Sequence, residues 1–201
     1  MREDLRHIQE RDVRLIKAIL QTRMNLELAV TDRMLDFSEE IQPEHACLVP
    51  EKREEVTAEG GLDVIGHMKI VARAVSRLQA IGSEVSLFID PDCQQIDAAC
   101  DVGAPVIELH TGCYADAIDE KKRAYEYHRI RQSAEYAHKK GLIVNAGHGL
   151  HYHNVQPIAA ISVIHELNIG HAIISRALSC GLKEAVRHMR ALMLESRIIL
   201  S

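Results

Sequence analysis

Short apolar runs recur along the whole chain, and each ends in a glycine or a polar residue. They predict β-strands at residues 24–29, 46–50, 85–90, 105–110, 142–146 and 166–169. Most of these runs lack the strict alternation of apolar and polar residues that is expected when one face of a sheet is exposed to solvent. They are typical of strands in a parallel sheet that is covered on both faces.

Apolar positions between these runs recur at helical spacing. They predict helices at residues 12–22, 32–41, 64–80, 93–102, 119–140 and 182–196, with a short helical turn within 154–164. Asp12 and Thr31 are suitable N-caps for the first two, Pro43 stops the second, and Gly82 ends the third. Strand followed by helix, repeated six times after an initial helix and without a dinucleotide-binding glycine fingerprint, favours an α/β barrel over a Rossmann fold.

The number of units falls short of a complete (β/α)8 TIM barrel. Such a barrel has eight strands and typically about 250 residues, whereas this chain has 201. We therefore expect one partial TIM-barrel domain over residues 1–201 with about six of the eight βα units. The two strands that complete the barrel would precede Met1.

Composition narrows the function classes. Hydrophobic residues make up 47% and charged residues 26%, and the net charge is −5, so neither nucleic acid nor a membrane surface is an expected partner. Aromatic residues are only 3% and Trp is absent, which argues against a stacking platform. Five cysteines without a Cys-x-x-Cys pair are typical of free thiols in the cytoplasm.

Two glycine–histidine turns carry the strongest functional signal. Gly147-His148-Gly149 follows one predicted strand and Gly170-His171 follows the next. Glycines at strand ends let backbone N–H groups approach a ligand, and the loops after the last two strands of a TIM barrel commonly bind a phosphate. The histidines add proton transfer near neutral pH.

Two carboxylates, Glu27 and Glu108, lie inside otherwise apolar strands. An unpaired buried carboxylate is costly, so each one indicates either acid/base chemistry in the barrel mouth or a structural ion pair. Arg23 and Lys52 are the candidate partners for such a pair.

Two further clusters leave alternatives open. His148, His151 and His153 would form a metal site only with another ligand such as His110 or His171, and they lack the spacing of a helical zinc pair. Arg2, Arg6 and His7 would bind a phosphate if they lie on a rim loop, or would simply be solvated.

Six segments together resemble one family, pyridoxine 5′-phosphate synthase of the deoxyxylulose-phosphate-dependent vitamin B6 route, over essentially the whole chain. They are Arg2-Glu3-Asp4 with His7, and residues 22–27, 48–53, 108–112, 144–150 and 166–171. The resemblance implies a TIM barrel that assembles into homo-octamers. It implies condensation of 3-amino-2-oxopropyl phosphate with 1-deoxy-D-xylulose 5-phosphate to pyridoxine 5′-phosphate, inorganic phosphate and water, without metal or organic cofactor.

The resemblance also implies a role for individual residues. Glu27 matches a catalytic base, His148 a proton donor, and Glu108 a carboxylate that stabilises charged intermediates. The residues matched to deoxyxylulose phosphate binding are Arg2, His7 and Thr57. Those matched to aminoketone phosphate binding are Gly149, Gly170 and His171.

The chain departs from the family at its start. Family members have two more strands upstream, which carry substrate contacts and a further catalytic histidine. We expect a fragment or a late-assigned start, and hold two alternatives to the synthase. One is a catalytically inactive barrel fragment that acts only through subunit contacts, and the other is a metal-dependent hydrolase that uses the His148–His153 cluster.

Overall fold

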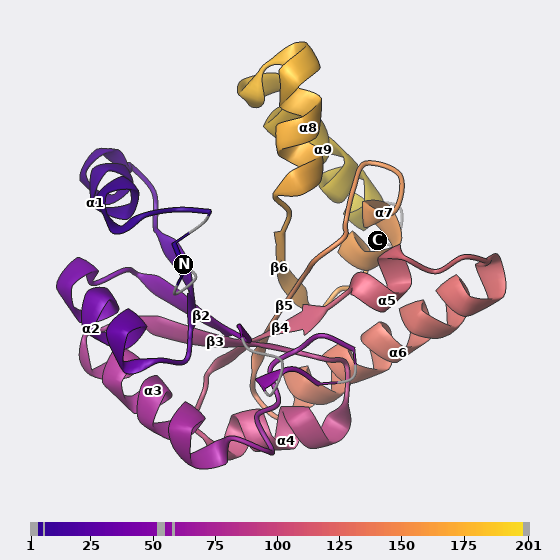
Figure 1. Ribbon diagram of the computed structural model, residues 1–201. Helices are drawn as coiled ribbons and strands as arrows, with labels where there is room; N and C mark the ends of the chain where they lie inside the picture. The colour runs from indigo at the N-terminus through magenta and orange to yellow at the C-terminus, as the bar shows by residue number, and fades with distance from the viewer. Residues whose placement is uncertain (1–3, 6, 52–54, 58, 199–201) are drawn as a thin grey trace. The chain divides into compact units, whose positions relative to one another are not determined.

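Parallel strands alternate with helices throughout the computed structural model, which describes residues 4, 5, 7–51, 55–57 and 59–198 (Figure 1). The chain divides into two compact units, Met1–Ile107 and Glu108–Ser201. Each unit is an α/β assembly, which confirms the predicted fold class of parallel strands and helices in alternation. The prediction of a single domain over residues 1–201 stays a prediction.

The first unit contains three complete strands that pair in parallel, β1 with β2 and β2 with β3. In chain order its elements are α1 (Glu10–Ile19), β1 (Asn25–Ala29), α2 (Asp32–Ile41), β2 (His45–Val49), α3 (Met68–Ala80), β3 (Glu84–Ile89) and α4 (Cys93–Asp101). Helices α2, α3 and α4 lie along one side of these strands (Figure 1).

The second unit contains the pair β5 and β6, also parallel, with an irregular register between Val144 and Asn145. Its elements after β4 (Val106–His110), which crosses the boundary between the units, are α5 (Gly112–Ala115), α6 (Glu120–Lys139), β5 (Ile143–Gly147), α7 (Val155–Ala159), β6 (Ile164–Asn168), α8 (His171–Cys180) and α9 (Leu182–Ile198). Helix α9 packs against α7 and α8.

Local sequence explains most helix starts. Thr31 caps α2 by accepting the N–H of Met34, as predicted, and Asp92 caps α4 by accepting the N–H groups of Gln94 and Gln95. The predicted start of α1 was wrong: Gln9 is the N-cap, and the Asp12 carboxylate accepts the Gln9 N–H as the third residue of a capping box. Helix α3 begins at Met68 and not at residue 64, because residues 64–67 form turns.

The prediction of strands buried on both faces holds for the central strands but not for β1 and β6. Every residue of β4 is buried, whereas Glu27 of β1 and His165 and Glu166 of β6 are exposed. Within the described residues, β1 pairs only with β2 and β6 only with β5. A strand with one neighbour leaves part of its surface uncovered.

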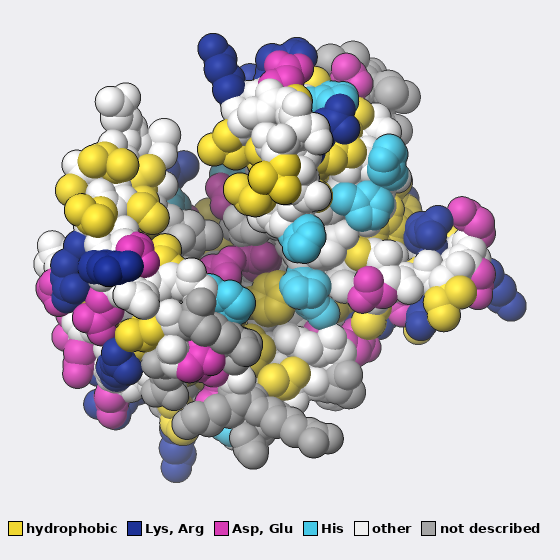
Figure 2. Space-filling view, turned by 45° about the horizontal axis from the view of Figure 1, so that its top comes forward, with side chains coloured by type: hydrophobic (Ala, Val, Ile, Leu, Met, Phe, Trp, Pro, Cys, Tyr) yellow, Lys and Arg dark blue, Asp and Glu magenta, His cyan; other side chains and the backbone are white. Residues whose placement is uncertain are grey.

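Helix α8 is an element that the periodicity did not predict. None of its side chains is buried, and two of its large hydrophobic residues, Ile174 and Leu178, are exposed. Figure 2 shows hydrophobic side chains on the surface of the molecule. The helix therefore lacks the contrast between a buried and an exposed face that marks helices in a sequence. Among the described helices, none has both the length and the apolar composition that crossing a lipid bilayer requires.

The carboxylate of Glu44, which lies just before β2, contacts two other segments of the first unit. Lys17 of α1 donates to Oε1 of Glu44 at 2.7 Å, and the N–H of Met24 donates to Oε2 at 2.9 Å. The Lys17 ammonium, followed by the Met24 N–H, lowers the pKa of Glu44 from 4.5 to about 2. The ionised carboxylate thus joins α1 to the residues that precede β1 and β2.

We expect Glu44→Gln to lower the thermal unfolding midpoint at pH 7, and this deficit to shrink in acid. A carboxyl group with a lower pKa in the folded chain stabilises the fold above pH 4.5 and loses that contribution as the pH falls towards 2. Circular dichroism melts of both proteins between pH 7 and 2 measure the deficit. Glu195→Gln, at an exposed position on α9, is the control; a deficit for Glu44→Gln that is constant with pH would contradict the account.

Candidate active site

Glu108 is a buried carboxylate at the centre of the candidate site in the second unit. Its residue lies on β4 and is 3% exposed. Nδ2 of Asn168, the last residue of β6, donates to its Oε2 at 2.6 Å. A donor of this kind offsets part of the free-energy cost of removing a carboxylate from water, and it fixes the direction in which the group points.

Gly147, at the end of β5, provides the space that this carboxylate occupies. A Cβ atom on Gly147 would overlap Oε1 of Glu108 and would lie 3.0 Å from the carbonyl oxygen of Asn168. A glycine is therefore required here, because residues of β4 and β6 come so close to Gly147 that a side chain would displace the Glu108 carboxylate.

His148 follows directly in an unusual backbone conformation. Its φ is +83°, in the left-handed region that residues with a Cβ atom rarely adopt. Thr111, after β4, holds this turn, because its N–H donates to the Gly147 carbonyl at 2.8 Å and its hydroxyl lies 2.6 Å from the His148 carbonyl. The turn leaves His148 exposed at the end of the strand.

A second histidine ring lies beside His148. His110 is buried, with 8% of the residue exposed, and its ring centroid is 4.8 Å from that of His148. Gly112 lies against both rings, since a Cβ atom there would be 2.7 Å from Nε2 of His110 and 3.3 Å from Cδ2 of His148. His110 and His148 thus form a pair of neighbouring imidazoles after β4 and β5, and Glu108 lies two residues before His110 on β4.

The glycines predicted to bind phosphate follow two strands, Gly149 after β5 and Gly170 after β6. Gly149 has a φ of +75°, and a Cβ atom there would lie 2.6 Å from Cβ of Ala115. Gly170 is the N-cap of α8, His171 is its first residue, and both are exposed. The first N–H groups of a helix lack partners within the helix, so this end of α8 suits an anion.

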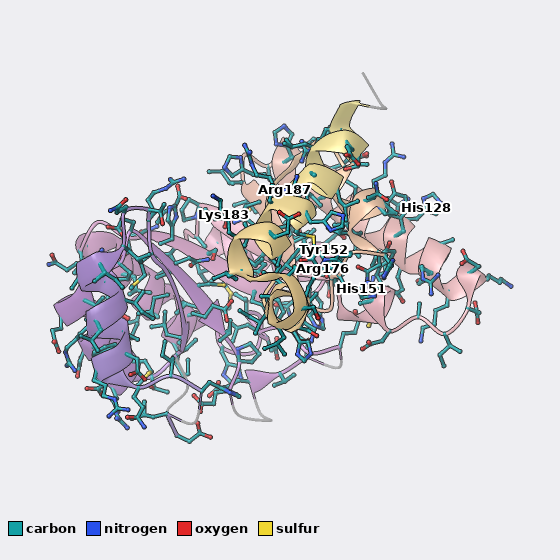
Figure 3. The ribbon with its side chains drawn as sticks, turned by 90° about the horizontal axis from the view of Figure 1, so that it is seen from above. His128, His151, Tyr152, Arg176, Lys183 and Arg187 are labelled. Carbon is teal, nitrogen blue, oxygen red and sulfur yellow. The ribbon has the colours of Figure 1, made fainter. Side chains whose placement is uncertain are left out.

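The loop after His148 is anchored to the last two helices. The Tyr152 hydroxyl donates to the carbonyl of Ala185 in α9 at 2.8 Å, and the guanidinium of Arg176 in α8 lies 4.7 Å from the Tyr152 ring centroid. Figure 3 shows Tyr152 and Arg176 close together, with His151 beside them. Burial raises the pKa of the Tyr152 phenol, so the hydroxyl stays protonated as a donor near neutral pH.

The remaining predicted residues belong to the first unit or lie outside the described residues. Glu27 is exposed on β1, so the expectation of a buried carboxylate was wrong for Glu27. It was right for Glu108. His7 is exposed, whereas Arg2, Arg6 and Lys52 lie outside the described residues.

Thr57 has a defined environment in the first unit. Its hydroxyl contacts Oδ2 of Asp90, just after β3, and also the carbonyl oxygen of Gly61 at 3.2 Å. The N–H of Gly61 donates to Oδ1 of Asp90 at 3.0 Å. Asp90 thereby fixes the loop that carries Thr57 to the end of β3.

His148, His151 and His153, the cluster predicted as an alternative metal site, are not arranged as metal ligands in the described structure. Nδ1 of His151 accepts the backbone N–H of His153 at 3.1 Å. Within the residues that the structure describes, no group of three or more His, Cys, Asp or Glu side chains is placed to hold a metal ion.

The sequence did not reveal the roles of Asn168 and Thr111, because their spacing along the chain carries no signal of their contacts with Glu108 and His148. Gly147 was singled out as part of a glycine–histidine turn, but not for the space that it leaves for Glu108. The one available signal was a polar or small residue at the end of each apolar run. Asn145 on β5 adds a buried acceptor, because its Oδ1 has no hydrogen-bond partner among the described residues.

Comparison with solved structures identifies the fold type. The crystal structure of the Amycolatopsis orientalis BexX/CysO complex matches with a TM-score of 0.58 and 16% identity, over 86% of this chain and 66% of that one. The EAL domain of Xanthomonas citri FimX, solved with c-diGMP, matches with a TM-score of 0.54 and 14% identity, over 78% of this chain and 63% of that one. At these identities, the likeness concerns the fold alone.

Comparison of sequences is more specific. The family model described as pyridoxal phosphate biosynthesis protein PdxJ matches residues 1–195. A pyridoxine 5′-phosphate synthase of Legionella pneumophila (strain Paris) is 75% identical over 198 residues, which are 98% of this chain and 80% of that protein. The corresponding protein of strain Corby is 74% identical over the same shares.

These matches confirm the resemblance drawn from the six segments. They cover both units and all of the residues assigned to the candidate site. The chain belongs to the PdxJ family of pyridoxal phosphate biosynthesis proteins, a family of biosynthetic enzymes in which these relatives are named pyridoxine 5′-phosphate synthases.

Proposed function

We propose that the protein condenses 3-amino-2-oxopropyl phosphate with 1-deoxy-D-xylulose 5-phosphate and closes the pyridine ring of pyridoxine 5′-phosphate, releasing inorganic phosphate and water. The observation that carries the proposal is the Glu108 carboxylate, buried yet directed by Asn168 across the space left by Gly147. The proposed chemistry needs both a carboxylate that is held in place and a proton donor.

Proton transfer is the main catalytic requirement of this reaction. When an amine condenses with a ketone, the carbonyl oxygen must gain protons before it leaves as water, and ring closure requires protons to be removed from carbon. Side chains that titrate near neutral pH accelerate such steps. His148 suits the role of proton donor, because the turn at the end of β5 leaves its ring accessible.

Glu108 suits a different role from His148. Amine–ketone condensation passes through positively charged iminium species, which a nearby carboxylate stabilises. Because Asn168 already fixes the carboxylate, little reorganisation is needed when that charge develops. We assign Glu108 to this electrostatic role.

Two phosphate groups must be held. For the aminoketone phosphate we propose Gly149, Gly170 and His171, because they combine a left-handed glycine turn with the N-terminus of α8. For the deoxyxylulose phosphate we propose Arg2, His7 and Thr57, on the family resemblance and on the fixed position of Thr57 beside Asp90. Glu27 is proposed as a base on the resemblance and on its accessibility to solvent.

We also propose that the protein works in the cytoplasm as a homo-oligomer, with the octamer of the family as the expected form. The alternative, an inactive barrel fragment that acts only through subunit contacts, is distinguished by the assay that follows.

The first test is product formation. Purified protein supplied with both substrates should yield pyridoxine 5′-phosphate, detected by chromatography and mass. His148→Asn should lower turnover by about 10²- to 10⁴-fold, because it removes the proton donor. His153→Asn, a change at an exposed position in the same loop, should leave turnover unchanged.

Two outcomes would contradict this proposal. If the wild-type chain folds but forms no product, the inactive-fragment alternative replaces the synthase. If His148→Asn keeps near-normal turnover, His148 is removed from the mechanism.

The second test concerns the space that Gly147 leaves for the Glu108 carboxylate. Gly147→Ala should destabilise the fold by about 1–3 kcal/mol, because the added Cβ overlaps Glu108 and must displace it. The same displacement should lower turnover. Denaturant unfolding and the product assay measure the two effects.

Gly170→Ala is the matched control for stability. A Cβ atom there meets nothing within 4 Å, so its unfolding midpoint should stay close to that of the wild type. Equal stability of Gly147→Ala and Gly170→Ala would show that Gly147 does not shape the site.

A further inference from the structure

Thr111 lies between β4 and α5 and makes three contacts to one turn on β5. Its residue is fully buried, with an exposed fraction of 0%. Its N–H donates to the Gly147 carbonyl at 2.8 Å, and its hydroxyl oxygen lies 2.7 Å from the Gly147 carbonyl and 2.6 Å from the His148 carbonyl.

The chemistry of the hydroxyl decides which contact matters. A threonine hydroxyl has one proton to donate, so two carbonyl oxygens compete for it. The Gly147 carbonyl already accepts the backbone N–H of Thr111, whereas the contact from Thr111 to the His148 carbonyl comes from the hydroxyl, at 2.6 Å. Removing the hydroxyl therefore removes this contact to the His148 carbonyl but leaves the Thr111 N–H on the Gly147 carbonyl.

The conformation of His148 explains why such a contact is needed. A φ of +83° is unfavourable for a residue with a Cβ atom, and it persists only where the surroundings hold it. Gly149 follows with a φ of +75°, and a glycine places little restraint of its own on the backbone here. The bond from Thr111 opposes relaxation of the turn and fixes the direction in which the imidazole leaves the backbone.

We propose that Thr111 is a positioning residue for the reaction: its hydroxyl holds the His148 carbonyl, keeps the left-handed turn, and so aims the imidazole that donates the proton. The inference rests on the proposed function of His148. Thr111 itself is buried and acts through His148.

The kinetic test uses Thr111→Val, which keeps the shape of the side chain and removes the hydroxyl, and Thr111→Ser, which keeps the hydroxyl. We expect Thr111→Val to lower kcat by ~10- to 100-fold with little change in KM, because a misaimed donor affects the chemical step more than binding. Thr111→Ser should restore most of the lost turnover.

A matched control separates positioning from stability. Thr31→Val removes the hydroxyl that caps α2, so it should lower the unfolding midpoint but leave kcat unchanged. Three results would overturn the proposal: wild-type kcat in Thr111→Val, a rise in KM without loss of kcat, or failure of Thr111→Ser to restore turnover while it remains folded.

A structural measurement distinguishes this inference from the proposed function. Crystal structures of Thr111→Val and of Thr111→Ser, the folded reference, should be compared. The His148 φ should be shifted from about +83° in the valine variant and unchanged in the serine variant. An unshifted φ would overturn the positioning role even if the enzyme is active. Absence of product from the wild-type protein would instead overturn the proposed function and leave the structural result to stand alone.

Discussion

The burial of the Glu108 carboxylate is the constraint on which the candidate site depends. A carboxylate that is 3% exposed requires a donor, and Asn168 supplies one at 2.6 Å. It also requires space, and Gly147 leaves that space by having no side chain. The Glu108 carboxylate on β4 is therefore in contact with residues at the ends of both β5 and β6.

The chain that follows each of these three strands also contributes residues to the candidate site. After β4, Thr111 holds the turn that carries His148, and after β5, Tyr152 joins the same loop to α8 and α9. After β6, Asn168 is followed within three residues by Gly170 and His171 at the start of α8. His148, which we propose as the proton donor, the Glu108 carboxylate and the proposed phosphate site are thus linked by short stretches of chain and a few direct contacts.

The sequence predicted those parts of the structure that depend on local patterns. Apolar runs located the six strands of the described residues, and the Thr31 cap and the Gly-His turns were correctly identified, because each is encoded by adjacent residues. Helix α8 was not predicted because it buries no side chain, and the start of α1 was misplaced because Asp12 acts inside the helix.

Contacts between segments that are distant in the sequence could not be predicted from local patterns. Nothing in the spacing of Glu108 and Asn168 indicates that their side chains meet 60 residues apart. The same is true of Thr111 and His148, and of the space that Gly147 provides. The exposure of Glu27 also differed from expectation, because an apolar strand was assumed to be covered on both faces and β1 is not.

Our central claim is that Glu108 is held in its working position before any substrate binds. Crystal structures of the wild-type protein, alone and soaked with inorganic phosphate, test it most directly. We expect the contact from Asn168 Nδ2 to Glu108 Oε2 to remain near 2.6 Å in both, with phosphate at the start of α8. A carboxylate that turns away from Asn168 in the phosphate-free crystal, or that reaches it only when phosphate is bound, would contradict the claim.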